Sequence, residues 1–185
     1  MLSEREQEIA LKLARETIEA FLENRAPKIP VQIPKGLLQK KGVFVTLTHN
    51  GKLRGCIGNL ENWQTVWEGI QENSLSAAFN DSRFLPLSKK EFAETKIEIS
   101  ILSMPKPLEF DSTKELLEKL VPNEHGIILE NNGRHATFLP SVWEELPEKE
   151  AFLSHLCMKA GLNPREWQSK QTKIWVYTAF RLEEK

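Results

Sequence analysis

The sequence has few of the features that mark secreted, metal-stapled or membrane-spanning proteins. It contains two cysteines, Cys56 and Cys157, among 185 residues, too few for a disulfide scaffold and without the repeated Cys-x-x-Cys spacing of zinc sites. Apolar runs fall short of the ~20 residues that cross a bilayer, and the first six residues lack the apolar segment of a signal peptide. We therefore expect reduced thiols, no metal site and a cytoplasmic protein.

Charge of one sign is also lacking. The chain carries 25 basic and 26 acidic residues, for a formal net charge of −1, which argues against a basic protein that coats phosphate backbones. A local basic patch stays open, so nucleic acid is unsupported as a partner but not excluded. A composition of 40% hydrophobic and 28% charged residues is typical of a folded globular chain. No cofactor and no membrane partner are expected.

The helix-capping, turn and strand patterns in the sequence predict an α+β fold with mainly antiparallel sheets and flanking helices. A capping box at Ser3 and Glu6 opens a long amphipathic helix. The Asn50-Gly51 and Asn132-Gly133 dipeptides predict two β-hairpins. Asn62 is expected to cap a helix that reaches residue 78, and one covered strand is expected over residues 173–181. We treat residues 1–185 as a single domain, because no linker marks a boundary.

The segment Leu53 to Gly58 carries the clearest chemical pattern. A strand period of two places Arg54 and Cys56 on one face, and an adjacent cation favours thiolate over thiol. Gly55 and Gly58 weaken a strand unless the backbone bends or something approaches closely, so they fit a bulge or a bound ligand.

An apolar setting for Cys56 is the competing interpretation. With a two-residue turn at Asn50-Gly51, Cys56 pairs with Val45, and this neighbour would raise the pKa of the thiol. A three-residue loop would reverse the facing. Free cysteine is among the most buried residue types and often serves as a small hydrophobe. The sequence leaves both interpretations open.

Three further polar residues are candidates for ligand binding. Asp81 and Arg83 follow a helix end in a segment expected to be an ordered loop, where they bind a polar ligand or pair with each other. His125 precedes a strand and suits acid or base chemistry at neutral pH, although a lone loop histidine is more often structural.

An ordered series of blocks resembles the AMMECR domain family, whose name refers to the Alport syndrome, intellectual disability, midface hypoplasia and elliptocytosis chromosomal region. The blocks are Leu53 to Gly58, Ala77-Ala78, Asp81 to Leu87, Ile99 to Ser103, His125 to Ile127, Phe138 to Pro140 and Lys159 to Gly161. The resemblance runs from the first helix to the last strand. One departure is Ser82, where the family often has proline.

The resemblance implies a larger and a smaller α+β lobe with a cleft between them, and a biochemical role that is unsettled. Family members are encoded beside Memo-type and radical SAM proteins, which the resemblance makes candidate pathway partners. We therefore expect a thiol-dependent or ligand-binding cleft centred on Cys56, with Arg54 as its electrostatic partner and with Gly55, Gly58, Asp81, Arg83 and His125 around the ligand. A small-molecule or protein-modification pathway suits this site.

The alternative is a non-catalytic adaptor or a nucleic-acid-associated binding module. In that class the same residues would hold a surface together and bind a macromolecule. Whether the chain is an enzyme is left open by the sequence.

Overall fold

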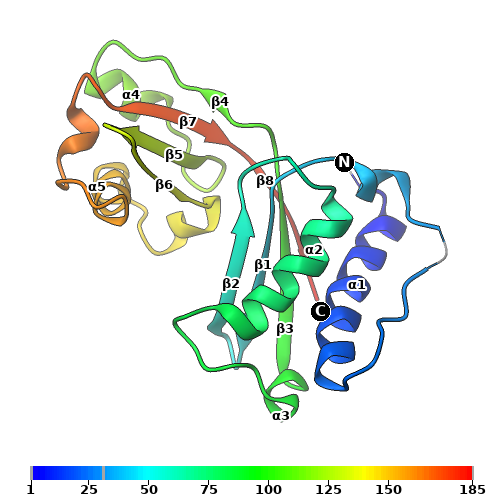
Figure 1. Cartoon of the computed structure of the whole chain (residues 1–185). Coiled ribbons are helices and arrows are strands. Elements are labelled where there is room, and N and C mark those ends of the chain that lie inside the picture. The colour runs from blue at the N-terminus through cyan, green and yellow to red at the C-terminus, as the bar shows by residue number, and fades with distance from the viewer. Residues whose placement is uncertain (1, 31, 185) are drawn as a thin grey trace. The chain divides into compact units, whose positions relative to one another are not determined.

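The chain folds into helices and two antiparallel four-stranded sheets, as the computed structural model shows for residues 2–30 and 32–184 (Figure 1). The α-helices are α1 (Glu4–Leu22), α2 (Val66–Leu75), α3 (Lys89–Phe92), α4 (Thr113–Lys119) and α5 (Lys149–Lys159). Short 3-10 turns occupy Lys35–Leu38, Pro140–Glu144 and Glu166–Gln168, and a π-helix, η2, occupies Ser76–Asn80. The α+β prediction is confirmed.

The strands divide between two compact units of the chain. Unit 1 comprises residues 1–102 and 180–185, and unit 2 comprises residues 103–179. The sheet of unit 1 has the order β2-β1-β3-β8, and that of unit 2 has the order β4-β7-β5-β6. The strands are β1 (Val43–His49), β2 (Lys52–Asn59), β3 (Thr95–Leu102), β4 (Lys106–Pro107), β5 (Gly126–Asn131), β6 (Arg134–Phe138), β7 (Lys173–Tyr177) and β8 (Ala179–Glu183).

Local sequence signals explain most element boundaries. The predicted capping box at α1 is present, because the Ser3 side chain accepts from the Glu6 amide while Glu6 accepts from the Ser3 amide. Both Asn-Gly pairs adopt positive φ, with 51° and 72° at Asn50 and Gly51. These are two-residue turns of the kind that matches the twist of antiparallel strands. The two hairpins are therefore confirmed.

Two predicted boundaries were wrong. Thr65, and not Asn62, caps α2, since its hydroxyl accepts from the Glu68 amide and Glu68 completes a capping box. The strand expected over residues 173–181 is two strands, β7 and β8, which belong to different sheets. The break falls at Thr178, whose carbonyl accepts from the Ser103 amide, so the chain leaves the ladder of unit 2 there.

In unit 1, helices α1 and α2 cover one face of the sheet. Val43, Val45 and Leu47 of β1 are fully buried in a core that includes Ile97, Ile99, and apolar residues of both helices. The intervening residues of β1 point to the opposite face and are only half-buried. This alternation is the mark of a sheet with one covered face. We call the other side the open face of unit 1.

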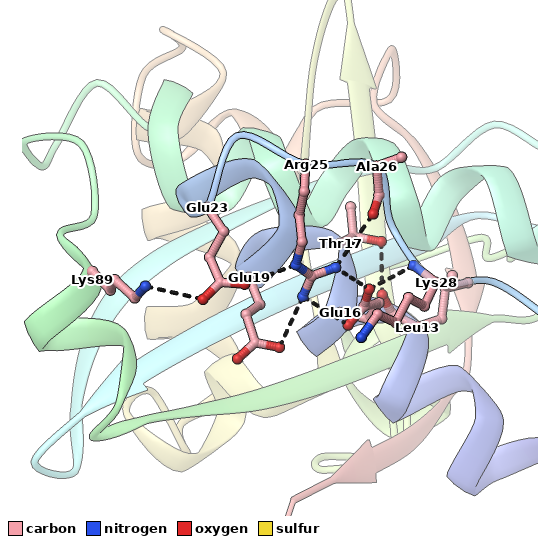
Figure 2. A network of polar contacts seen from close by, with 9 residues as sticks. All are labelled: Leu13, Glu16, Thr17, Glu19, Glu23, Arg25, Ala26, Lys28 and Lys89. Carbon is pink, nitrogen blue, oxygen red and sulfur yellow. Dashed lines mark hydrogen bonds and ion pairs between the residues drawn. The ribbon is translucent and has the colours of Figure 1, made fainter.

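A charged network fixes the end of α1 (Figure 2). Arg25 forms ion pairs with Glu16, Glu19 and Glu23, and the Lys28 amide donates to Glu16 over 2.6 Å. The side-chain hydrogen bond from Arg25 is the main reason that the pKa of Glu16 is lowered to about 2, with the Lys28 amide second. Carboxylates at a helix C-terminus face the unfavourable end of the helix dipole, so Arg25 offsets a repulsion that α1 would otherwise carry.

We predict that Arg25→Gln raises the pKa of Glu16 from about 2 toward its ordinary value of 4.5. In the native chain, the contribution of Glu16 to stability is present above the ordinary pKa and is lost as pH falls through about 2. Carboxyl-carbon NMR titration measures the shift. Lys89→Gln, which removes only the contact to Glu23, is the matched control and should leave Glu16 unchanged. An unchanged Glu16 titration in Arg25→Gln would contradict the assignment.

Candidate functional site

A β-bulge reshapes the segment that holds Cys56. Leu47 pairs with Gly55 and Thr48 pairs with Leu53, so Arg54 is an extra residue on β2. The bulge shifts the register by one, and Cys56 lies opposite Thr46, not Val45 as the unbulged two-residue hairpin predicted. That prediction was wrong because a bulge inverts the facing of every residue beyond it.

The close approach of η2 to β2 explains the glycine beside the bulge. A Cβ at Gly55 would overlap the carbonyl oxygen of Ala77, a backbone atom that cannot move aside. Ala77 belongs to η2, and π-helical turns of this kind are rare and frequently occur at functional sites. Bulge, glycine contact and π-helix therefore meet at one point on the edge of unit 1.

The side chains of Asp81 and Arg83 bind the backbone of Cys56 on the outer edge of β2, where no further strand of the described chain pairs. The Cys56 amide donates to Asp81 Oδ2 over 2.9 Å, and Arg83 Nη2 donates to the Cys56 carbonyl over 3.3 Å. Arg83 also binds Asp81 through Nε at 2.9 Å and Nη2 at 2.7 Å. These side-chain hydrogen bonds hold the pKa of the buried Asp81 carboxyl far below its usual range. An exposed strand edge invites pairing with another chain, and the Asp81–Arg83 pair blocks it.

The thiol of Cys56 is desolvated. Burial raises its pKa, and this effect outweighs the lowering by the hydrogen bond from the Thr46 hydroxyl, 3.2 Å from Sγ, and by the charge of Arg83. Asp81 and Glu98 raise it further. At neutral pH the group is therefore a thiol and not a thiolate, which reduces its power as a nucleophile.

Arg54 is committed to contacts away from the thiol. Its Nε donates to Glu91 over 3.2 Å and its Nη2 donates to the Leu85 carbonyl over 2.8 Å. The Arg54 and Arg83 guanidinium carbons lie 5.6 Å and 5.5 Å from the centroid of the Phe84 ring. Arg54 thus fixes the loop after Asp81, whereas Arg83 is the cation whose charge reaches Cys56. The sequence predicted that Arg54 lies beside Cys56 because residues two apart in a strand share a face. The bulge at Arg54 interrupts that alternation.

On the open face, a row of polar side chains extends from Cys56 across the neighbouring strands of the sheet. Cys56 pairs with Thr46 of β1, and Thr46 pairs with Glu98 of β3. Glu98 in turn accepts from Arg181 of β8, with an N–O distance of 2.5 Å. Thr46, Glu98 and Arg181 were not among the site residues predicted from the sequence. The polar members of the alternating β1 and β3 patterns were the only signal that pointed to them.

Gly58 and His125 have different structural settings. A Cβ at Gly58 would overlap the ring of Phe44, so the glycine lets this aromatic side chain pack over β2 on the open face. His125 belongs to unit 2, where its Nδ1 accepts from the Val121 amide over 3.2 Å and its carbonyl accepts from Trp143 Nε1 over 2.7 Å. Structural contacts therefore occupy one ring nitrogen of His125.

Residues 2–30 and 32–184 contain no group of three or more His, Cys, Asp or Glu side chains placed to hold a metal ion. Within the same residues, no helix is both long and apolar enough to cross a membrane.

Comparison with known proteins identifies close relatives. The chain is 42% identical to Protein MK0488 of Methanopyrus kandleri, over 97% of this chain and 88% of that one. It is 36% identical to Protein NEQ441 of Nanoarchaeum equitans, over 94% and 97% of the two chains. A crystal structure of the uncharacterized protein PH0010 from Pyrococcus horikoshii superposes with a TM-score of 0.92 at 31% identity, covering 100% of this chain and 94% of that one.

A family model supplies the classification of this two-unit α+β protein. The AMMECR1 model matches residues 11–182, which include most of unit 1, all of unit 2 and every candidate site residue. The chain therefore belongs to the AMMECR1 family, as the ordered blocks of its sequence predicted. The relatives carry names that assign no activity.

We predict that Gly55→Ala destabilises unit 1 by about 3 kcal/mol, because the added methyl group meets backbone. It should also speed hydrogen exchange of the Cys56 amide, since η2 and Asp81 must move. Gly51→Ala has open space around it and only a positive φ to oppose it, so it should cost about 1–2 kcal/mol and leave that amide protected. Chemical unfolding and exchange NMR measure both effects. Equal Cys56 exchange in the two variants would refute the close-approach explanation.

Proposed function

We propose that this protein is a non-catalytic binding module, and that its site is the edge and open face of unit 1 around Cys56. The observation that carries the proposal is the burial of Cys56, which raises the pKa of its thiol. A nucleophilic cysteine needs the opposite shift. Cys56 then contributes a neutral S–H, beside the Thr46 hydroxyl and the Arg83 guanidinium, for contact with a polar ligand.

The irregular backbone supports a ligand-binding role over simple packing. A bulge at Arg54, a π-helix at Ser76–Asn80 and the close glycine contact at Gly55 concentrate at one edge. Such features lower the stability of a fold and tend to persist where they position a site. The Arg83 side chain is 53% exposed although Asp81 anchors it, so a preorganised cation faces solvent beside the thiol.

Thiol-dependent catalysis is the second candidate. The hydrogen bond from Thr46 and the charge of Arg83 both lower the pKa of Cys56, and a ligand that brought a further cation beside the thiol would strengthen this effect. A catalytic role in a modification pathway with Memo-type or radical SAM partners would require such a change. The titration of Cys56 distinguishes the two candidates.

We predict that Cys56 reacts with iodoacetamide with an apparent pKa above the ordinary ~8.5 of a free cysteine. Arg83→Gln should raise this pKa further, because it removes the cation that lowers it. Lys52→Gln is the matched control and should leave the pKa unchanged, since it removes an exposed cation of β2 that is not among the groups shifting the pKa of Cys56. Peptide-resolved mass spectrometry against pH gives the rates. An apparent pKa below that of free cysteine would restore the thiol enzyme as the leading function.

We also predict where small ligands bind. In a screen of carboxylate, amine and aromatic fragments by protein-observed NMR, the shifted amides should cluster at Thr46, Cys56 and Arg83. Thr137 and Tyr177, whose hydroxyl groups bond each other in unit 2, serve as reference positions that should not shift. If the fragments collected on other surfaces and left Cys56 unaffected, the proposed binding site would be wrong.

A further inference from the structure

The open face of unit 1 carries an aromatic ring on a central strand. Phe44 lies on β1, between β2 and β3 in the sheet order, and is half-buried. Gly58 leaves room for the ring against β2. Sheets whose helices cover one face and whose central strands present aromatic side chains on the other are suited to stack planar bases. Phe44 therefore presents a partly exposed aromatic ring on this face of the sheet.

Hydrogen-bonding groups lie in the adjacent register row. Thr46 and Cys56 supply a hydroxyl and a thiol, and Glu98 supplies a carboxylate that is 18% exposed. Glu98 already accepts from Arg181 and, at 3.4 Å, from the Ser100 hydroxyl. A carboxylate has about four lone-pair positions, so it can accept a further N–H. The exocyclic amino group of cytosine is such a donor. Uracil has no amino group and offers only its ring N3–H, which lies at a different position on the base edge.

A cation borders this row. Arg83 bonds Asp81 and the Cys56 carbonyl through Nε and Nη2. Its Nη1 makes no hydrogen bond to any residue that the structure describes, and the side chain is 53% exposed. Guanidinium groups bind phosphate oxygens strongly. The asymmetric arrangement, with a ring and a carboxylate on the face and a cation at its edge, matches a ligand with a base at one end and a phosphate at the other.

We propose that the open face of unit 1 binds a nucleotide with an amino-bearing base. Phe44 stacks on the base, Glu98 accepts from its amino group, and Arg83 holds the phosphate. This inference rests on the proposed binding function and names its ligand class. A free mononucleotide and one residue of a single-stranded RNA share this chemistry, and they are distinguished by the ligands tested.

The test is a calorimetric titration of the full chain with CMP, UMP, cytidine and pentacytidylate. We predict that CMP binds at least about 5-fold more tightly than UMP, and that cytidine binds more weakly than CMP. Phe44→Leu keeps an apolar side chain and removes the stacking ring, so it should weaken CMP binding about 10-fold. Trp63→Leu is the matched control, because Trp63 is an exposed aromatic residue of unit 1 outside these strands, and it should bind as the native chain does.

Two further variants assign the polar contacts. Glu98→Gln should bring the ratio of CMP to UMP affinity close to one, because Gln donates as well as accepts. Arg83→Gln should bring the ratio of CMP to cytidine affinity close to one, and Arg83→Lys should retain part of it. Tighter binding of pentacytidylate than of CMP supports RNA as the source of the nucleotide, and equal binding supports a free nucleotide.

Absence of CMP binding at millimolar concentration would overturn this inference, as would CMP binding that Phe44→Leu leaves unchanged. The proposed function fails separately, because the titration of Cys56 and the fragment screen need no nucleotide. At a CMP concentration near the native dissociation constant, CMP should also slow alkylation of Cys56 in the native chain and slow it much less in Phe44→Leu. Fragments clustering at Cys56 without any nucleotide binding would leave the binding module intact and discard its nucleotide ligand.

Discussion

The hydrogen bond from the Cys56 amide to the Asp81 carboxylate is the contact on which the geometry of the site depends. Asp81 has only 4% of its side chain exposed, and a buried carboxylate needs compensating donors. It receives them from the Cys56 amide and from Arg83. The same contact seals the edge of β2 and fixes Arg83 beside the thiol. Removal of the carboxylate would leave a strand edge open and a cation without its anchor.

The backbone around this contact departs from regular strand and helix geometry in three places. The bulge at Arg54 turns Cys56 toward the open face, and the π-helix brings Ala77 and then Asp81 up to β2. Gly55 is required at the crossing because no side chain fits against the Ala77 carbonyl. The bulge, the π-helix and the glycine act together, because each is needed for η2 and Asp81 to reach the backbone of β2. Together they convert the end of α2 and an edge strand into a rigid polar surface.

The electrostatic character of that surface differs from a typical thiol active site. Charged groups near Cys56 act in both directions, with Arg83 lowering and Asp81 and Glu98 raising the pKa of its thiol, while burial has the largest effect. Neutral hydrogen-bonding groups, a partly exposed guanidinium and an aromatic ring favour recognition over covalent chemistry. This balance is why we propose a binding role for this chain. Its membership of the AMMECR1 family, shown by the match over residues 11–182, assigns no activity of its own.

Local chemistry determined much of the fold from the sequence alone. The capping box at Ser3 and the two Asn-Gly turns depend on residues within four positions of each other, so their outcomes could be predicted. Tertiary structure decided the rest. The bulge at Arg54 depends on packing between β2 and η2, and it exchanged Val45 for Thr46 as the partner of Cys56. Glu98 lies 42 positions after Cys56 in the numbering of the chain and reaches the site only through the pairing of β1 with β3. Sequence patterns specify which face a residue takes within one strand, but only the assembled sheet specifies which residues share that face.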